Sequence, residues 1–184
     1  MTTTETADLY RRLAENLTAT VAAVPADRWA SPSPCEGWNA RDLLRHIIET
    51  QSFPLGPAGL TLPPVPDVDA DPLGAWTQTR DAVQEILDDP ARASLEFDGQ
   101  MGRTSVASTF ARFIAFDLAV HRWDMARAAG LDETLPEEDL AMIAGFTEQM
   151  GEALRSPGVC GPAVPTPADA DTQTRLLGLL GRRV

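Results

Sequence analysis

Apolar residues recur at three- and four-residue steps over several stretches of this chain, and this spacing constrains its fold more than any other feature. In the first stretch, residues 6–24, the stripe consists of Leu9, Leu13, Leu17 and Val24. A period near 3.6 residues places them on one face of an amphipathic helix, and that face must be buried against other elements. The same pattern predicts further helices over residues 40–52, 72–87, 105–129, 136–154 and 171–180. The predicted fold class is therefore all-α.

Capping residues and prolines mark where these helices begin and end. Asn39 is a suitable N-cap, and Asp42 three residues later completes a variant of the capping box. Gly130 supplies a C-terminal stop for the long helix before it. Residues 54–72 hold six prolines and predict a long connection. Residues 94–97 alternate weakly and are followed by the pair Asp98-Gly99, which allows a short strand or hairpin.

Length and charge exclude some classes of protein. A chain of 184 residues with 43% hydrophobic composition can bury one core, so one domain over residues 1–184 is expected. The chain has 15 basic residues, all arginine, against 27 acidic ones, which gives a formal charge of −12. Neither nucleic acids nor anionic membranes are expected as partners, because a protein needs basic patches to bind them. No stretch approaches the roughly 18 apolar residues of a membrane span, so a cytoplasmic location is expected.

The only two histidines of the chain each lie in a predicted helix. Asp117 and His121 are four residues apart, so their side chains share a helix face and can reach one ion. A neighbouring helix of a bundle can add His46 as a third ligand. Two imidazoles and a carboxylate suit Zn, Ni, Fe or Co better than Mg or Ca, and zinc is the expected ion. Three protein ligands leave positions open for water or substrate, as in catalytic sites.

Other interpretations of these residues are open at this stage. An Asp and a His at this spacing are also common on solvated helix surfaces, and His46 could belong to an exposed charge cluster with Asp42 and Glu49. However, apolar residues flank the face that carries Asp117 and His121, and a polar group buried there without a partner would be costly. This flanking pattern strengthens the case for a metal site, but the residues alone leave both a metal site and a solvated surface open.

Four residues near these positions have uncertain roles. Trp38 and Trp123 could line a pocket beside the ion, although tryptophans in such places more often pack in a core. Asp124 could orient His121 or serve as a surface charge. Cys35 has Arg41 as its one basic neighbour in the sequence and is expected to be an inert loop thiol.

Three segments stand out as motifs: residues 34–46 (PCEGWNARDLLRH), residues 116–128 (FDLAVHRWDMARA) and residues 171–182. Together they resemble actinobacterial metal-binding proteins of the DinB/YfiT-like superfamily, near the N-terminal domain of mycothiol-dependent maleylpyruvate isomerase. The resemblance implies a four-helix bundle with extra short helices and long Pro-rich loops. It also implies one metal ion, bound by a histidine of the second helix and a carboxylate-x-x-x-histidine pair on a later helix.

His46, Asp117 and His121 occupy these ligand positions. The isomerase has glutamate where this chain has Asp117, so the shorter carboxylate must approach the ion more closely or act through water. The resemblance thus points to the same three residues as the spacing does.

Two functions are compatible with this resemblance. In the first, the protein is a mycothiol-dependent transferase or isomerase, in which the metal ion activates a small thiol for reaction with a small electrophile. In the second, it is a non-catalytic binding or sensing domain with a structural or vestigial metal site. A purely structural domain would bind no metal at all. Apolar bundle faces that remain uncovered would allow a homodimer.

Overall fold

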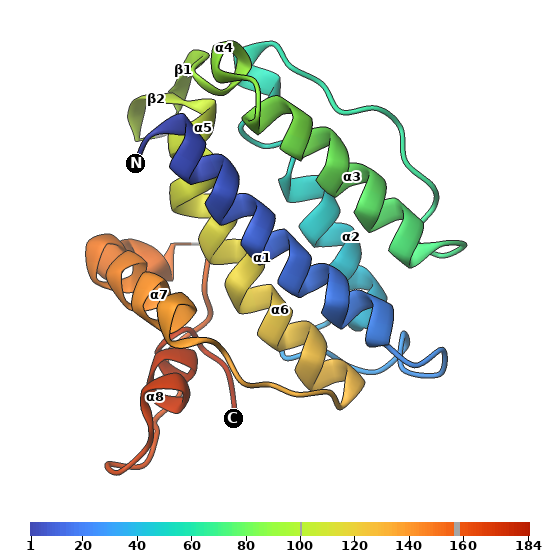
Figure 1. Cartoon of the computed structure of the whole chain (residues 1–184). Coiled ribbons are helices and arrows are strands. Elements are labelled where there is room, and N and C mark those ends of the chain that lie inside the picture. Colours follow the sequence, from blue (N-terminus) through green and yellow to red (C-terminus); the bar gives the residue numbers. More distant parts are fainter. Residues whose placement is uncertain (100, 157–158) are drawn as a thin grey trace.

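The computed structural model describes residues 1–99, 101–156 and 159–184, and most of them are helical (Figure 1). The elements follow in chain order as α1 (Thr3–Ala23), α2 (Ala40–Thr50), the 3₁₀ turn η1 (Gly56–Ala58), α3 (Pro72–Leu87), α4 (Pro90–Ala93), β1 (Glu96–Gly99), β2 (Gly102–Ser105), α5 (Val106–Thr109), the π-helical turn η2 (Phe110–Ile114), α6 (Ala115–Ala129), α7 (Glu137–Met150), the 3₁₀ turn η3 (Gly151–Arg155) and α8 (Thr172–Leu179). A mainly helical fold is therefore confirmed. The small hairpin, in which β1 pairs antiparallel with β2, amends the all-α prediction.

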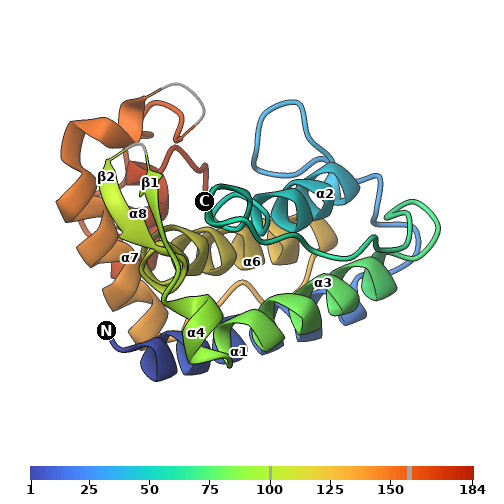
Figure 2. The ribbon, with the colours of Figure 1, turned by 90° about the horizontal axis from the view of Figure 1, so that it is seen from above.

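Helices α1, α2, α3 and α6 pack side by side (Figures 1 and 2). Helix α1 contacts α3 and α6, and α2 contacts the same two helices. Each helix contributes fully buried side chains to the shared core, among them Leu17 of α1, Leu44 of α2, Trp76 of α3 and Trp123 of α6. The apolar stripes of the sequence thus face one another, and removing them from water supplies the main stabilising term of this packing.

The start of α2 is fixed by the predicted capping box. The Asn39 side chain accepts hydrogen bonds from the backbone N–H groups of Arg41 and Asp42, and the Asp42 carboxylate accepts from the Asn39 N–H. Leu44 and Ile47, on the apolar face of the helix that begins there, are completely buried in the core. His46, between them, is carried to the flank that faces α6.

The predicted helix over residues 105–129 is helical from Val106 onward, but it is not one regular α-helix. Its middle is a π-helical turn, in which the Ala115 N–H donates to the Phe110 carbonyl, five residues earlier. A π turn contains one extra residue, so the side chains of the residues that follow it are rotated about the helix axis. Such turns are frequent at functional sites. Helix α6 then ends at Gly130, whose φ of 71° lies in the left-handed region, as its C-terminal stop requires.

The C-terminal part lies beside the four packed helices, with α7 against α6 and α8 against α7 (Figures 1 and 2). Helix α7 ends at Met150, four residues before the predicted end, because Gly151 has a φ of 50° and a 3₁₀ turn follows. After α8, Gly181 has a φ of 85° and lies close to the Gly161 and Pro162 carbonyls, so the chain turns back there. Among the described helices, none is both long and apolar enough to cross a membrane.

Candidate metal centre

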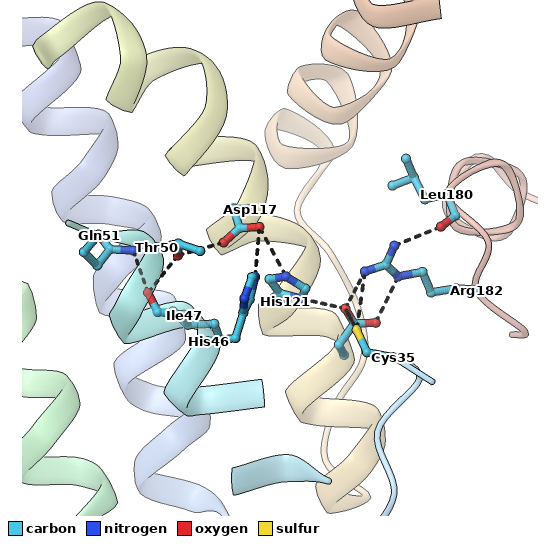
Figure 3. Close-up of polar contacts among 10 residues, drawn as sticks. Cys35, His46, Ile47, Thr50, Gln51, Asp117, His121, Leu180 and Arg182 are labelled. Carbon is cyan, nitrogen blue, oxygen red and sulfur yellow. Dashed lines mark hydrogen bonds and ion pairs between the residues drawn. The ribbon is translucent and has the colours of Figure 1, made fainter. Parts of the chain in front are cut away.

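Side chains of two helices converge on one point between α2 and α6 (Figure 3). The Asp117 Oδ1 atom lies 3.2 Å from His121 Nε2 and 3.9 Å from His46 Nε2. The three potential ligand atoms all lie within 4.8 Å of one another. A tetrahedral ion with ligands at about 2.0–2.1 Å would hold its ligand atoms about 3.3 Å apart. A small movement of His46 Nε2 toward Asp117 would bring the three atoms to such separations.

Neighbouring groups hold the carboxylate and one imidazole in place. The hydroxyl of Thr50, the last residue of α2, shares its proton between Asp117 Oδ2 at 3.2 Å and the Ile47 carbonyl at 3.0 Å, and Asp117 Oδ1 faces the imidazoles. The His46 ring packs against Trp38 at 4.7 Å between centroids and meets the His121 ring edge-to-face at 5.1 Å. The exposed fractions of the side chains are 31% for His46, 23% for Asp117 and 9% for His121, so the group is open on one side.

The second nitrogen of His121 points away from this group toward a buried carboxylate. His121 Nδ1 lies 2.8 Å from Asp124 Oδ2, and Asp124 is completely buried. Arg182, after α8, donates to Asp124 from Nε at 3.2 Å and from Nη2 at 2.8 Å. Cys35 Sγ lies 3.6 Å from Asp124 Oδ2 and 3.8 Å from Arg182 Nη2 (Figure 3).

The electrostatics of this group favour a positive charge between the two aspartates. Burial alone would raise the pKa of Asp117, but His121 and His46 beside it hold that pKa below its usual range. Burial alone would lower the pKa of His121, but the Asp117 charge and the hydrogen bonds to Asp117 and Asp124 raise it well above its usual value. The two carboxylates therefore favour the protonated form of His121 when no metal is bound, and a cation bound at Nε2 would have to replace the proton there.

A second set of potential ligands shares His121 and consists of Cys35, His121 and Asp124. On this side, however, the guanidinium group of Arg182 already engages both oxygens of Asp124. A metal ion would therefore meet a fixed positive charge there and would have to displace two hydrogen bonds. The set of His46, Asp117 and His121 is the better candidate for a metal ion.

A cavity of about 1180 Å³ opens beside these three residues. Trp38 and aromatic residues of α6, α7 and the π-helical turn form part of its wall. There Phe116 stacks on Phe146 at 4.0 Å between centroids, and Phe113 meets Phe146 edge-to-face at 5.8 Å. Cys35 and the chain from Val159 to Pro165 also line the cavity. The cavity therefore combines an aromatic wall with the polar group formed by the two histidines and Asp117.

The predicted site residues lie together, and the ambiguous neighbours can now be placed. Trp38 lines the cavity, whereas Trp123 is fully buried in the core. Asp124 is no surface charge, because it is buried against His121. The exposed cluster around His46 does not form, since Asp42 bonds instead to the Asn39 backbone and to Arg45.

The expectation that Cys35 has no basic neighbour except Arg41 is wrong. Arg182 lies 3.8 Å from its sulfur, and His121 belongs to the same cluster of side chains. Arg182 itself has no predicted role, although it stands in the last of the three motifs. Its contact with Asp124 spans 58 positions of the chain, and no local pattern reports such a contact.

Comparison with known proteins tests the resemblance that these motifs suggested. Residues 10–59 match the family model of the mycothiol maleylpyruvate isomerase N-terminal domain. The resemblance to that family is thus confirmed. The matched segment of this chain contains His46 and ends before α3, so it does not include Asp117 or His121.

Two relatives match nearly the whole chain, and both are named as uncharacterized proteins. One is from Mycobacterium tuberculosis strain CDC 1551 / Oshkosh and one from strain ATCC 25618 / H37Rv. Each is 29% identical over 178 residues, which covers 95% of this chain and 96% of the relative. No solved structure matches the chain significantly. These relatives confirm the expected actinobacterial affinity and leave the activity to be argued from the site.

Proposed function

We propose that the protein binds one divalent metal ion, zinc in the first place, through His46, Asp117 and His121. The helices α1, α2, α3 and α6 would then correspond to the four-helix bundle of DinB/YfiT type. The observation that carries this proposal is the convergence of two imidazoles and one carboxylate, from two helices, on the wall of a cavity. Zinc, nickel, iron and cobalt all accept this ligand set.

The surroundings of the three residues fit such an ion. One oxygen of Asp117 contacts the Thr50 hydroxyl, and one nitrogen of His121 contacts Asp124. Asp117 Oδ1 and His121 Nε2, the atoms that remain, lie 3.2 Å apart. A carboxylate that holds the outer nitrogen of a histidine is the usual support of a metal-bound imidazole, because it fixes the tautomer and the ring orientation.

For the reaction, we propose a mycothiol-dependent transferase or isomerase that joins a small thiol to a small electrophile. A bound divalent ion supplies Lewis acidity that lowers the pKa of a thiol in its open position. The match to the mycothiol maleylpyruvate isomerase N-terminal domain supports the choice of thiol. The wall formed by Phe113 and Phe116 would hold the apolar part of the electrophile and keep water from that side of the cavity.

The first experiment is elemental analysis of the purified protein after separate additions of Zn, Ni and Fe. The variants His46→Ala, Asp117→Ala and His121→Ala are measured beside the wild type. Glu15→Gln, an exposed carboxylate of α1, is the matched control. We expect about one equivalent of metal in the wild type and the control. Each of the three site variants should lose most of it.

The second experiment follows the consumption of electrophiles in the presence of mycothiol and other small thiols. Turnover that needs both thiol and metal, and that disappears in His121→Ala, supports the reaction. If the protein binds metal but no electrophile of the panel is consumed, the result would favour a non-catalytic binding or sensing domain over an enzyme. A wild-type protein that takes up no metal under any addition would remove the proposal as a whole.

A further inference from the structure

The last residues of the chain return to the proposed metal centre through a single arginine. Arg182 is only 9% exposed, and its guanidinium group bonds in three directions. Nε and Nη2 donate to the two oxygens of Asp124, and Nη1 donates to the Leu180 carbonyl at 2.9 Å. Figure 3 shows this group on the side of His121 opposite to Asp117. Arg182 therefore connects the end of α8 to α6 directly behind a proposed metal ligand.

We propose that Arg182 is a positioning residue for the metal centre. By holding both oxygens of Asp124, it fixes the ring of His121 so that Nε2 faces Asp117 and His46. It also determines on which side of His121 a cation binds. This inference rests on the proposed function, because it assigns Arg182 a role toward the metal ion of that site.

The hydrogen-bond geometry explains why an arginine is needed. Asp124 Oδ2 accepts from both His121 Nδ1 and Arg182 Nη2, and Oδ1 accepts from Arg182 Nε. The planar fork of the guanidinium group thus prevents the carboxylate from rotating, which a single ammonium group cannot do as well. Without this fork, the Asp124 carboxylate would be free to turn and bind a cation together with Cys35, whose sulfur lies 3.6 Å away.

A purely structural role would also explain a buried ion pair, since Arg182 anchors the C-terminal segment. The chain offers a matched control for that role. Arg155 anchors the same segment by donating to the carbonyls of Gly161 and Leu179, but it forms no hydrogen bond with Asp124 in the described part of the chain. A variant of Arg155 therefore loosens the C-terminal segment and leaves the contact behind His121 intact.

The experiment compares Arg182→Gln, Arg182→Lys and Arg155→Gln with the wild type, after circular dichroism has established that each is folded. The first readout is the zinc dissociation constant, measured by competition with a chelator. The second readout is independent of metal: in metal-free protein labelled with ¹⁵N-histidine, it is the ring N–H signal of His121. Only two histidines are present, so His46→Ala assigns both imidazoles.

We expect Arg182→Gln to weaken zinc binding about 10- to 100-fold, the usual effect of losing the support behind a metal ligand. Arg182→Lys should fall between this variant and the wild type, and it keeps the test available if Arg182→Gln does not fold. Arg155→Gln should bind zinc as the wild type does. The slowly exchanging Nδ1–H of His121 should be present in the wild type and in Arg155→Gln and absent in Arg182→Gln.

Two results would overturn the proposal. One is a folded Arg182→Gln variant that keeps both the zinc affinity and the His121 signal of the wild type. The other is an equal loss of affinity in Arg155→Gln, which would reduce Arg182 to an anchor of the C-terminal segment. If the wild type binds no zinc, the proposed function fails, and the His121 signal then decides alone whether Arg182 positions the ring.

Discussion

Replacing Arg182 with Gln should destabilise the fold much more than replacing an exposed arginine. Asp124 is completely buried and would lose both hydrogen bonds from the charged guanidinium group. Removing one partner of a buried ion pair leaves an uncompensated charge and costs about 3–5 kcal/mol. With a urea m-value of about 2 kcal/mol per molar, the unfolding midpoint should fall by about 1.5–2.5 M.

Urea unfolding followed by circular dichroism measures this change directly. The matched control is Arg11→Gln, because Arg11 pairs with Asp8 and Asp88 but is 41% exposed, and exposed pairs contribute about 0–1 kcal/mol. The double variant Asp124→Asn with Arg182→Gln should lose less stability than the two single variants together, since no buried charge is left behind. A midpoint shift in Arg182→Gln no larger than that of Arg11→Gln would refute this reasoning.

Three further predictions concern the metal centre. Zinc binding at pH 7 should release close to one proton, because the raised pKa of His121 keeps its imidazole protonated in metal-free protein. For the same reason, the zinc affinity should fall about tenfold for each pH unit below that pKa. Calorimetry in buffers of different ionisation enthalpy measures this release, and identical heats would contradict it. Cys35→Ser should leave zinc affinity unchanged, because Cys35 lies beside Asp124 and Arg182; a sulfur-to-metal absorption band in the cobalt-loaded wild type would show the opposite. Thr50→Val should weaken zinc binding about tenfold by releasing Asp117 Oδ2, which chelator competition can test against Thr172→Val on the exposed start of α8.

Local patterns predicted most of the helices because helix formation depends on neighbours three and four residues apart. Helix α3 spans the predicted residues 72–87, and the capping box of Asn39 begins α2 as expected. The π-helical turn was not predicted, because one extra residue in a turn leaves an apolar pattern that still looks helical. The early end of α7 was missed for a similar reason, since a glycine in a helical pattern does not reveal its φ.

The candidate ligands could be predicted for two different reasons. Asp117 and His121 lie one turn apart on the same helix, so their proximity follows from helix geometry alone. His46 was proposed because a neighbouring helix of a bundle can supply a third ligand, and the resemblance to a known family pointed to the same residue. The spacing within one helix does not say which face of another helix it meets. The same limit made Cys35 look isolated, although Arg182 lies 147 positions further along the chain and close to its sulfur.

The sequence by itself determined where most of the helices form, which faces are apolar and that Asp117 and His121 lie one turn apart on the same helix face. These properties depend on interactions over a few residues, whose energies do not need the rest of the fold. Only the tertiary structure decided that α2 turns His46 toward α6, that Asp124 is buried and that the end of the chain returns Arg182 to it. These contacts join distant segments, and they follow from how the apolar faces pack together rather than from any local pattern.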